Sequence, residues 1–171
     1  TLDGATVDGI ARLNADGSPD TAFTQAVSST GDESGFYRPE GSGFPEGSGW
    51  TYDLAVQTDD KIVVGGEFTA LNGVAATSIA RLDADGTPDM AFTESVRSTG
   101  NGTAFRDESR LFVHAVEVQG DGKIVVGGGF TTLNGARANR IARLDADGTP
   151  DAAFIENTGA GFSASTWAVA T

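Results

Sequence analysis

One fourteen-residue sequence occurs three times in this chain, and it constrains the fold more than any other feature. The sequence IARLDADGTPDMAF runs from Ile79 to Phe92, and close variants begin at Ile10 and Ile141. The copies start 69 and then 62 residues apart. A period of this length indicates a repeat protein, in which each copy is one supersecondary unit that buries its apolar faces against its neighbours. We therefore expect an array of similar units.

The complete copies share a block of fixed length and one connection of variable length. Trp50 and Phe112 each lie 29 residues before the Ile that opens the common sequence. The connections from Phe23, Phe92 and Phe154 to the next such aromatic residue shorten along the chain, from 27 to 20 to 13 residues. Insertions confined to one loop per repeat are typical of solenoids and propellers. If Trp167 is aligned with Trp50 and Phe112, the chain divides into half a unit with a long loop, two complete units with their loops, and the first strand of a further unit, at residues 1–49, 50–111, 112–166 and 167–171.

Each complete copy predicts four short strands. Residues 50–57 and 112–119 have the alternation of a first strand, and Asp121-Gly122 or the weaker Asp59-Asp60 marks the following hairpin turn. The second strand, KIVVGG, is continuously apolar, as expected when both faces are covered, and its paired glycines are expected to let another backbone approach closely. IARL predicts the third strand, before an Asp-Gly turn.

Proline defines the position of the fourth strand. Pro19, Pro88 and Pro150 cannot donate to a ladder, so this strand belongs at the edge of its sheet. An antiparallel meander with strand one innermost and strand four outermost describes a propeller blade. We predict an all-β protein of β-propeller blades, each a four-stranded antiparallel sheet. A β-sandwich and a parallel β-helix are the alternatives, and the hairpin turns argue against the β-helix because its strands are parallel.

The composition favours a soluble chain that does not span a membrane and does not bind nucleic acid. No apolar run approaches the ~18 residues that would suggest a membrane span. The net charge of −13, from 11 Lys and Arg against 24 acids, opposes binding to phosphates. The absence of Cys excludes disulfides and thiolate metal sites. Neither an initiating Met nor a signal peptide precedes Thr1, so we expect the chain to come from a longer protein.

Residues 59–92 and 119–154 closely resemble the bacterial delta-60 repeat, whose members are similar to β-propellers and occur in large secreted or cell-surface proteins. The resemblance covers two copies and the second half of a first. It implies a propeller fold and an extracellular or cell-surface location, and it carries no motif of catalytic residues. Two features depart from it: Asp60 stands where a turn glycine is expected, and the loop from Thr24 to Gly49 is unusually long.

Asp83, Asp85 and Asp89 form a D-x-D-G-x-x-D pattern that invites a calcium interpretation, because Ca²⁺ prefers hard oxygen ligands. The pattern recurs from Asp145 to Asp151. It lacks the sixth-position glycine and the distal Glu of a calcium loop, and the same residues describe a hairpin turn. We therefore expect neither a metal site nor a cofactor.

Arg12, Arg81 and Arg143 recur at one point of the third strand. Each is expected to serve the repeat itself, by pairing with a neighbouring acid or by covering apolar surface with its stem. His114 is the only histidine and lies where the other copy has Tyr52. Because no Ser, Cys or second His completes a triad, it is a poor catalytic candidate.

The long loop supplies the candidate ligand-binding residues, which are Phe36, Tyr37, Arg38 and Phe44. In an antiparallel meander the variable loops all lie at one end of the sheets, and aromatic residues on such loops can bind a protein or a glycan. The alternative is that these aromatic residues pack on the blade below.

We predict an extracellular, non-enzymatic propeller segment that serves adhesion or scaffolding through this loop face. One alternative is a subunit of a surface filament whose blades are completed by neighbouring chains. Another is part of a propeller enzyme acting on polysaccharide, for which Glu33, Glu40 and Glu46 are acids on the variable face. We also expect that the array cannot close on itself, and that its open ends associate with another copy or with further blades of a parent chain.

Overall fold

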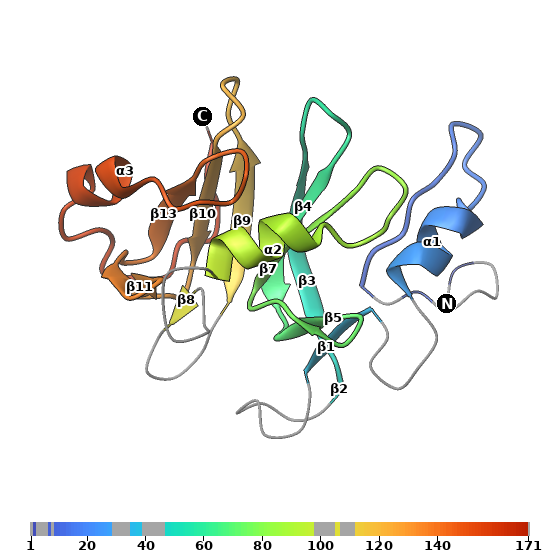
Figure 1. Ribbon diagram of the computed structural model, residues 1–171, viewed down its shortest axis with the longest axis horizontal. Coiled ribbons are helices and arrows are strands. Elements are labelled where there is room, and N and C mark those ends of the chain that lie inside the picture. Colours follow the sequence, from blue (N-terminus) through green and yellow to red (C-terminus); the bar gives the residue numbers. More distant parts are fainter. Residues whose placement is uncertain are drawn as a thin grey trace.

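The computed structural model of the protein describes residues 2, 7, 9–28, 35–38, 47–97, 105–106 and 112–170. Strands in small antiparallel sheets dominate this part of the chain, with three short helices among them. The repeats lie side by side in a row, and the two ends of the chain lie at opposite ends of that row (Figure 1). The protein is therefore all-β and propeller-like, as the repeat predicts, and the row is open.

Each complete repeat forms one three-stranded antiparallel sheet with the strands in chain order. In the second repeat β4 (Ile62–Glu67) lies between β3 (Trp50–Val56) and β7 (Ile79–Leu82). In the third repeat β10 (Ile124–Gly128) lies between β9 (Val113–Val118) and β13 (Ile141–Leu144). The first strands of the two sheets are neighbours: the ring of Tyr52 on β3 lies 5.0 Å from that of His114 on β9.

The hairpin turn between the first and second strands forms in both sheets. Gly122 has a φ of 84°, and Asp60 takes the same left-handed conformation with a φ of 63°. The replacement of the expected glycine by Asp60 is therefore tolerated, although a residue with a Cβ adopts this conformation at some cost.

The fourth strand is shorter than predicted. Each proline forms one antiparallel bridge with the last residue of the third strand, and the pairs are Leu13–Pro19, Leu82–Pro88 and Leu144–Pro150. The prolines thus lie at the outer edge, as predicted, but strand pairing ends there. A helix follows in every repeat: α1 (Thr21–Val27), α2 (Met90–Arg97) and α3 (Ala152–Asn157). None of these helices, which are those of the described residues, is long and apolar enough to cross a membrane.

The aspartate after each proline explains why a helix begins. Oδ1 of Asp89 accepts a hydrogen bond from the backbone N–H of Phe92 at 3.1 Å, and Asp20 and Asp151 do the same one repeat away on either side. This is the geometry of a helix N-cap, which satisfies an otherwise unpaired backbone donor. Phe92 and Val96 are one helical turn apart and both are buried.

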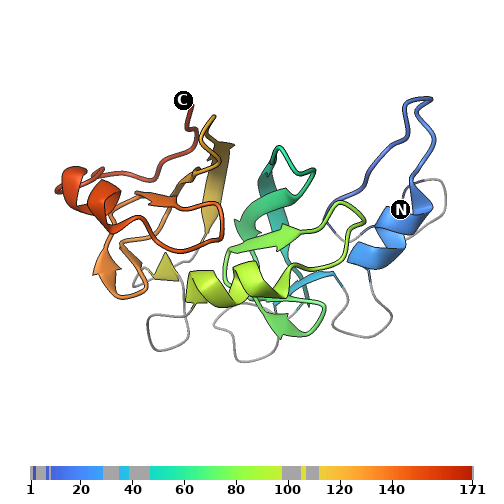
Figure 2. The same ribbon diagram turned by 45° about the horizontal axis from the view of Figure 1, so that its top comes forward.

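The long connections form small sheets with the hairpin of the following repeat. Strand β1 (Phe36–Arg38) lies between β2 (Gly47–Ser48) and β5 (Ala70–Leu71), and β5 also pairs with β6 (Val74–Ala75). One repeat later, the corresponding sheet consists of β8 (Phe105–Arg106), β11 (Thr132–Leu133) and β12 (Ala136–Arg137). These small sheets lie at the end of the main sheets opposite the hairpin turns (Figure 2). We call this the loop end and the other the turn end.

The hydrophobic core lies between neighbouring sheets. Val63 on β4 belongs to a core cluster with Val113 of the third repeat, whereas the next residue, Val64, belongs to a cluster with Phe23 of α1. Both faces of the second strand are therefore covered, which accounts for its continuous apolar sequence. A Cβ on Gly65 would lie 2.7 Å from Cγ1 of Val113 in the next repeat, which is a side chain. The predicted close approach of another backbone occurs at the second glycine, because a Cβ on Gly66 would lie 2.1 Å from the backbone oxygen of Trp50.

The segment that contains Trp167 packs on the third sheet. Its position is shifted by two residues from the predicted alignment of Trp167 with Phe112. In both complete repeats a β-branched residue of the following segment packs against the first of the two paired glycines. These contacts are Val113 with Gly65, and Thr166 with Gly127. Trp167 therefore takes the place of His114, whereas alignment of the aromatic residues put it opposite Phe112. The register follows from packing against the glycine, which the aromatic pattern alone does not reveal.

Candidate functional site

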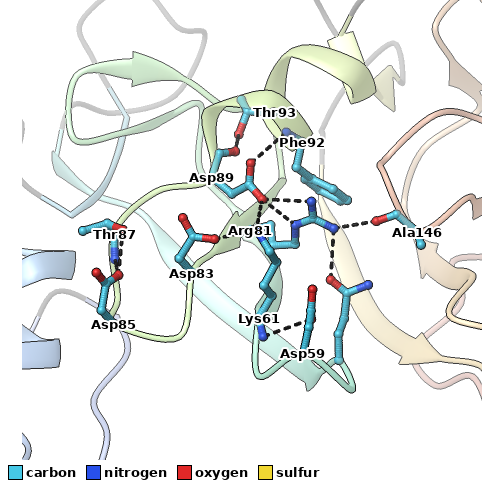
Figure 3. Close-up of polar contacts among 11 residues, drawn as sticks. Asp59, Lys61, Arg81, Asp83, Asp85, Thr87, Asp89, Phe92, Thr93 and Ala146 are labelled. Carbon is cyan, nitrogen blue, oxygen red and sulfur yellow. Dashed lines mark hydrogen bonds and ion pairs between the residues drawn. The ribbon is translucent and has the colours of Figure 1, made fainter.

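Each copy of the common sequence builds an ion-pair cluster at the turn end, shown for the second repeat in Figure 3. Nε and Nη2 of Arg81 lie 3.0 and 2.8 Å from Oδ2 of Asp89, and Nζ of Lys61 lies 2.7 Å from the same oxygen. The guanidinium carbon of Arg81 also lies 4.4 Å from the centroid of the Phe92 ring. The predicted role of the recurring arginine, pairing with an acid and covering apolar surface, is confirmed.

The same arginines connect neighbouring repeats. Nη1 of Arg81 donates to Oε1 of Gln57 at 3.1 Å and to the backbone carbonyl of Ala146 in the third repeat. Arg12 donates in the same way to the carbonyl of Ala84 in the second repeat. Arg12 and Arg81 thus tie the turn end of their own repeats to the next one, which is a structural role.

The charges in this cluster are held in their ionised forms. Burial by itself raises the pKa of Asp89, but hydrogen bonds from Lys61, the Phe92 N–H and Arg81 outweigh it and lower that pKa from 3.8 to about 2. Hydrogen bonds to Asp83 and Asp89 raise the pKa of Lys61. Asp89 and Lys61 therefore keep their opposite charges near neutral pH.

The three aspartates of the calcium pattern are engaged with other groups of the protein, and Asp83 and Asp89 share Lys61 (Figure 3). Oδ1 of Asp85 accepts hydrogen bonds from the N–H and hydroxyl of Thr87, at 2.9 and 2.7 Å, which closes the hairpin turn. Asp83 accepts from Lys61 at 2.6 Å, and Asp89 caps the helix. Within the described ranges, no three His, Cys, Asp or Glu side chains come together as metal ligands.

Three of the four predicted ligand-binding residues form β1 and are buried. Phe36 is 1% exposed, with its ring 4.7 Å from that of Phe68, and Tyr37 and Arg38 are 9% and 8% exposed. Phe44 lies outside the described residues. Phe36 is covered because it packs in the core cluster that contains Phe68 and Leu71. Ligand binding by this set stays a prediction, and Arg38 is the member that contacts an exposed ring.

The structure brings together aromatic side chains that are far apart in the sequence. We call them the aromatic row, and they are Trp50, Tyr52, Phe112, His114 and Trp167. The ring of His114 lies 4.5 Å from Phe112 and is stacked on Trp167 at 3.9 Å and 19°. Trp50, Tyr52 and Trp167 are 55%, 42% and 73% exposed. Large exposed rings of this kind are frequent in recognition surfaces.

A buried ion pair lies beside the first two rings of the row. Nη1 of Arg38 lies 3.3 Å from Oε1 of Glu67, which is 6% exposed. The hydroxyl of Tyr52 donates to Oε2 of Glu67 at 2.9 Å, and the guanidinium carbon of Arg38 lies 4.6 Å from the centroid of Trp50. The pair therefore fixes both rings through one hydrogen bond and one cation–π contact.

His114 joins the rings of the second and third repeats. Burial lowers its pKa, against the opposing effect of Glu67, so the imidazole is neutral at neutral pH. Its Nε2 has no hydrogen-bond partner among the residues that the structure describes. A neutral ring without a basic partner suits stacking, and it lacks the oriented neighbours of a catalytic histidine.

Part of the aromatic row could be anticipated from the sequence. The fixed positions of Trp50 and Phe112 and the alternation of a strand put Trp50 and Tyr52 on one face of β3. The sequence also shows His114 at the position of Tyr52. The contact between these rings depends on how the sheets pack, and the partnership of Arg38 with Glu67 depends on the path of the long loop.

The fold and its repeat define an all-β protein of the β-propeller class. The sequence matches the family described as "Domain of unknown function (DUF5122) beta-propeller" over residues 1–23, 57–92 and 119–154, which is more than half of the chain. The chain belongs to this family. The matched ranges contain the ion-pair clusters, whereas the aromatic row lies outside them. Neither a curated protein nor a solved structure is significantly similar to the chain.

Proposed function

We propose that the chain is a non-enzymatic segment of an extracellular or cell-surface protein, and that it serves adhesion or scaffolding by binding a protein or a glycan. The observation that carries this proposal is the aromatic row, in which three rings are 42% to 73% exposed and two of them, Trp50 and Tyr52, contact a buried ion pair. Exposed aromatic residues on a rigid scaffold are suited to recognition. Assignment to the delta-60 repeat is part of this proposal and rests on the sequence resemblance.

The use made of the charged residues supports a non-enzymatic role. The recurring Asp, Lys and Arg side chains bind one another and the backbone of the next repeat, as Arg81 does with Asp89 and Ala146. The single histidine is stacked between aromatic rings. The three acids Glu33, Glu40 and Glu46 of the enzyme alternative lie outside the described residues.

A second candidate, a subunit of a surface filament, is favoured by the open face of β3. Leu54 and Val56 on this face are 48% and 57% exposed. Val116, which occupies the position of Leu54 one repeat later, is 4% exposed because it packs against Gly65. A further blade placed on β3, from a longer chain or from another copy, would bury the same positions.

Adhesion can be measured with beads that carry the full chain. We expect such beads to bind bacterial cells, and beads carrying a chain with both Trp50→Ala and Trp167→Ala to lose most of that binding. The cellular location can be checked by treating intact cells that make the parent protein with a protease. Absence of adhesion, equal adhesion of both chains, or protection from the protease would refute the proposal.

Filament formation has a separate test in sedimentation velocity. If neighbouring copies cover β3, the full chain sediments as a series of oligomers at micromolar concentration, and Leu54→Asp shifts it to the monomer. A monomer at every concentration would exclude this second candidate and leave adhesion by the aromatic row unaffected.

A further inference from the structure

A difference between the two complete repeats explains why Trp50 is exposed. In the third repeat the position of Glu67 is Gly129, and a Cβ there would lie 2.1 Å from Cε2 of the Phe112 ring, which covers it. In the second repeat the side chain of Glu67 stands at that position, and Trp50, the equivalent of Phe112, is 55% exposed. The exposure of Trp50 therefore goes with the residue at position 67 of its own repeat.

The ion pair beneath Trp50 offers hydrogen bonding without a net charge. Arg38 and Glu67 have opposite charges 3.3 Å apart, and both residues are more than nine-tenths buried. Nε of Arg38 has no hydrogen-bond partner among the described residues, although it is buried. An unpaired buried donor is costly, so the pair retains unused hydrogen-bonding capacity beneath the Trp50 ring.

We propose that the aromatic row, with Arg38 and Glu67, binds a neutral glycan chain whose pyranose rings stack on Trp50 and Trp167. This inference rests on the proposed function, because it names the partner of the same surface. The C–H face of a pyranose packs on an indole ring, while hydroxyl groups at its edge accept from or donate to the ion pair. The arrangement supplies both kinds of contact side by side.

Charge and shape select a neutral polymer. The chain has a net charge of −13, which repels uronic acid and sulfated polymers at long range. The row contains rings from two repeats and from the segment that follows them, and the ring of His114 stacks between those of Tyr52 and Trp167. Because His114 lies between its two neighbours, the rings left open to a sugar are those of Trp50 and Trp167, and two separate platforms suit a chain of sugars better than one monosaccharide.

Fluorescence gives a direct test, because the chain contains two tryptophans and both belong to the aromatic row. The full chain is titrated with glucomannan and laminarin as neutral probes and with polygalacturonate as the anionic one. We expect a saturable change with a neutral probe and none with polygalacturonate. Trp50→Ala and Trp167→Ala should each raise Kd by about tenfold or more, as measured by retardation in native gels. Leu13→Ala is the matched control, since Leu13 is also 55% exposed but lies outside the row.

Glu67→Gly tests the cause of the exposure. This variant copies the third repeat, so we expect the Trp50 ring to close over position 67, its emission to shift to shorter wavelength, and neutral glycan binding to weaken. A single cooperative thermal transition would show that each variant folds, and Glu67→Gly should unfold at a lower temperature because Arg38 loses its buried partner. The inference is overturned if neither neutral probe binds, if polygalacturonate binds equally well, or if Trp50→Ala and Leu13→Ala give the same Kd. Adhesion of coated beads to cells without glycan binding would also overturn it, and would leave the proposed function standing with a protein partner.

Discussion

Substitution of Arg81 by Met removes the central residue of the ion-pair cluster while keeping an apolar stem of similar length. The side chains of Arg81 and Asp89 are 10% and 9% exposed, so the change leaves a buried carboxylate with fewer donors. Breaking a buried ion pair costs about 3–5 kcal/mol. Because Lys61 still contacts Asp89, we expect the lower limit, about 3 kcal/mol. For a chain of 171 residues, that corresponds to a fall in Tm of roughly 6–12 °C.

The repeats provide a matched control for this prediction. Arg12 makes the same contacts with Asp20, Phe23 and the next repeat, but its side chain is 42% exposed. Thermal denaturation followed by circular dichroism should therefore show a fall in Tm for Arg12→Met that is less than half of that for Arg81→Met. Equal effects of the two substitutions, or a change below 2 °C for Arg81→Met, would show that burial of the cluster does not determine its contribution.

Three further predictions follow from the same structure. The folded pKa of Asp89 lies below its unfolded value, so its contribution to stability is present above about pH 4 and lost between about pH 4 and 2; Asp89→Asn should flatten that part of a plot of unfolding free energy against pH. Addition of EDTA should leave Tm unchanged, and a fall of more than ~5 °C would contradict the turn interpretation of the aspartates. Ala152 lines a pocket of ≈ 380 Å³ at the position that Met90 occupies one repeat earlier; Ala152→Met should raise the free energy of unfolding in urea by about 0.5–1 kcal/mol, and a loss of stability would show that the pocket does not accept the side chain.

The sequence determined the repeating unit and much of its internal order. Alternation along 50–57, the continuous apolar second strand and the Asp-Gly turns predicted sheets that the structure contains, because these patterns report contacts within a few residues. Pro88 was placed at the sheet edge for a local reason, its missing N–H, and it lies there. The pairing of Arg81 with an acid followed from its chemistry alone.

The helices after the prolines have a local signal that the predicted fourth strand did not take into account. Asp89 is an N-cap residue, and Phe92 and Val96 have helical spacing. The strand stops at Pro88 because the next residue caps a helix. A meander of four full strands was therefore too regular an expectation for this sequence.

Tertiary structure alone decided which aromatic residues are exposed. Phe36 and Tyr37 lie on a long loop, but their strand is central in a small sheet and they are buried. Trp50 is in a strand, but it is exposed where Glu67 stands in place of a glycine. These outcomes depend on contacts between segments that are distant in the sequence, and neither period nor residue type reports such contacts. The same reason explains why packing against Gly127, and not the aromatic pattern, set the register of Trp167.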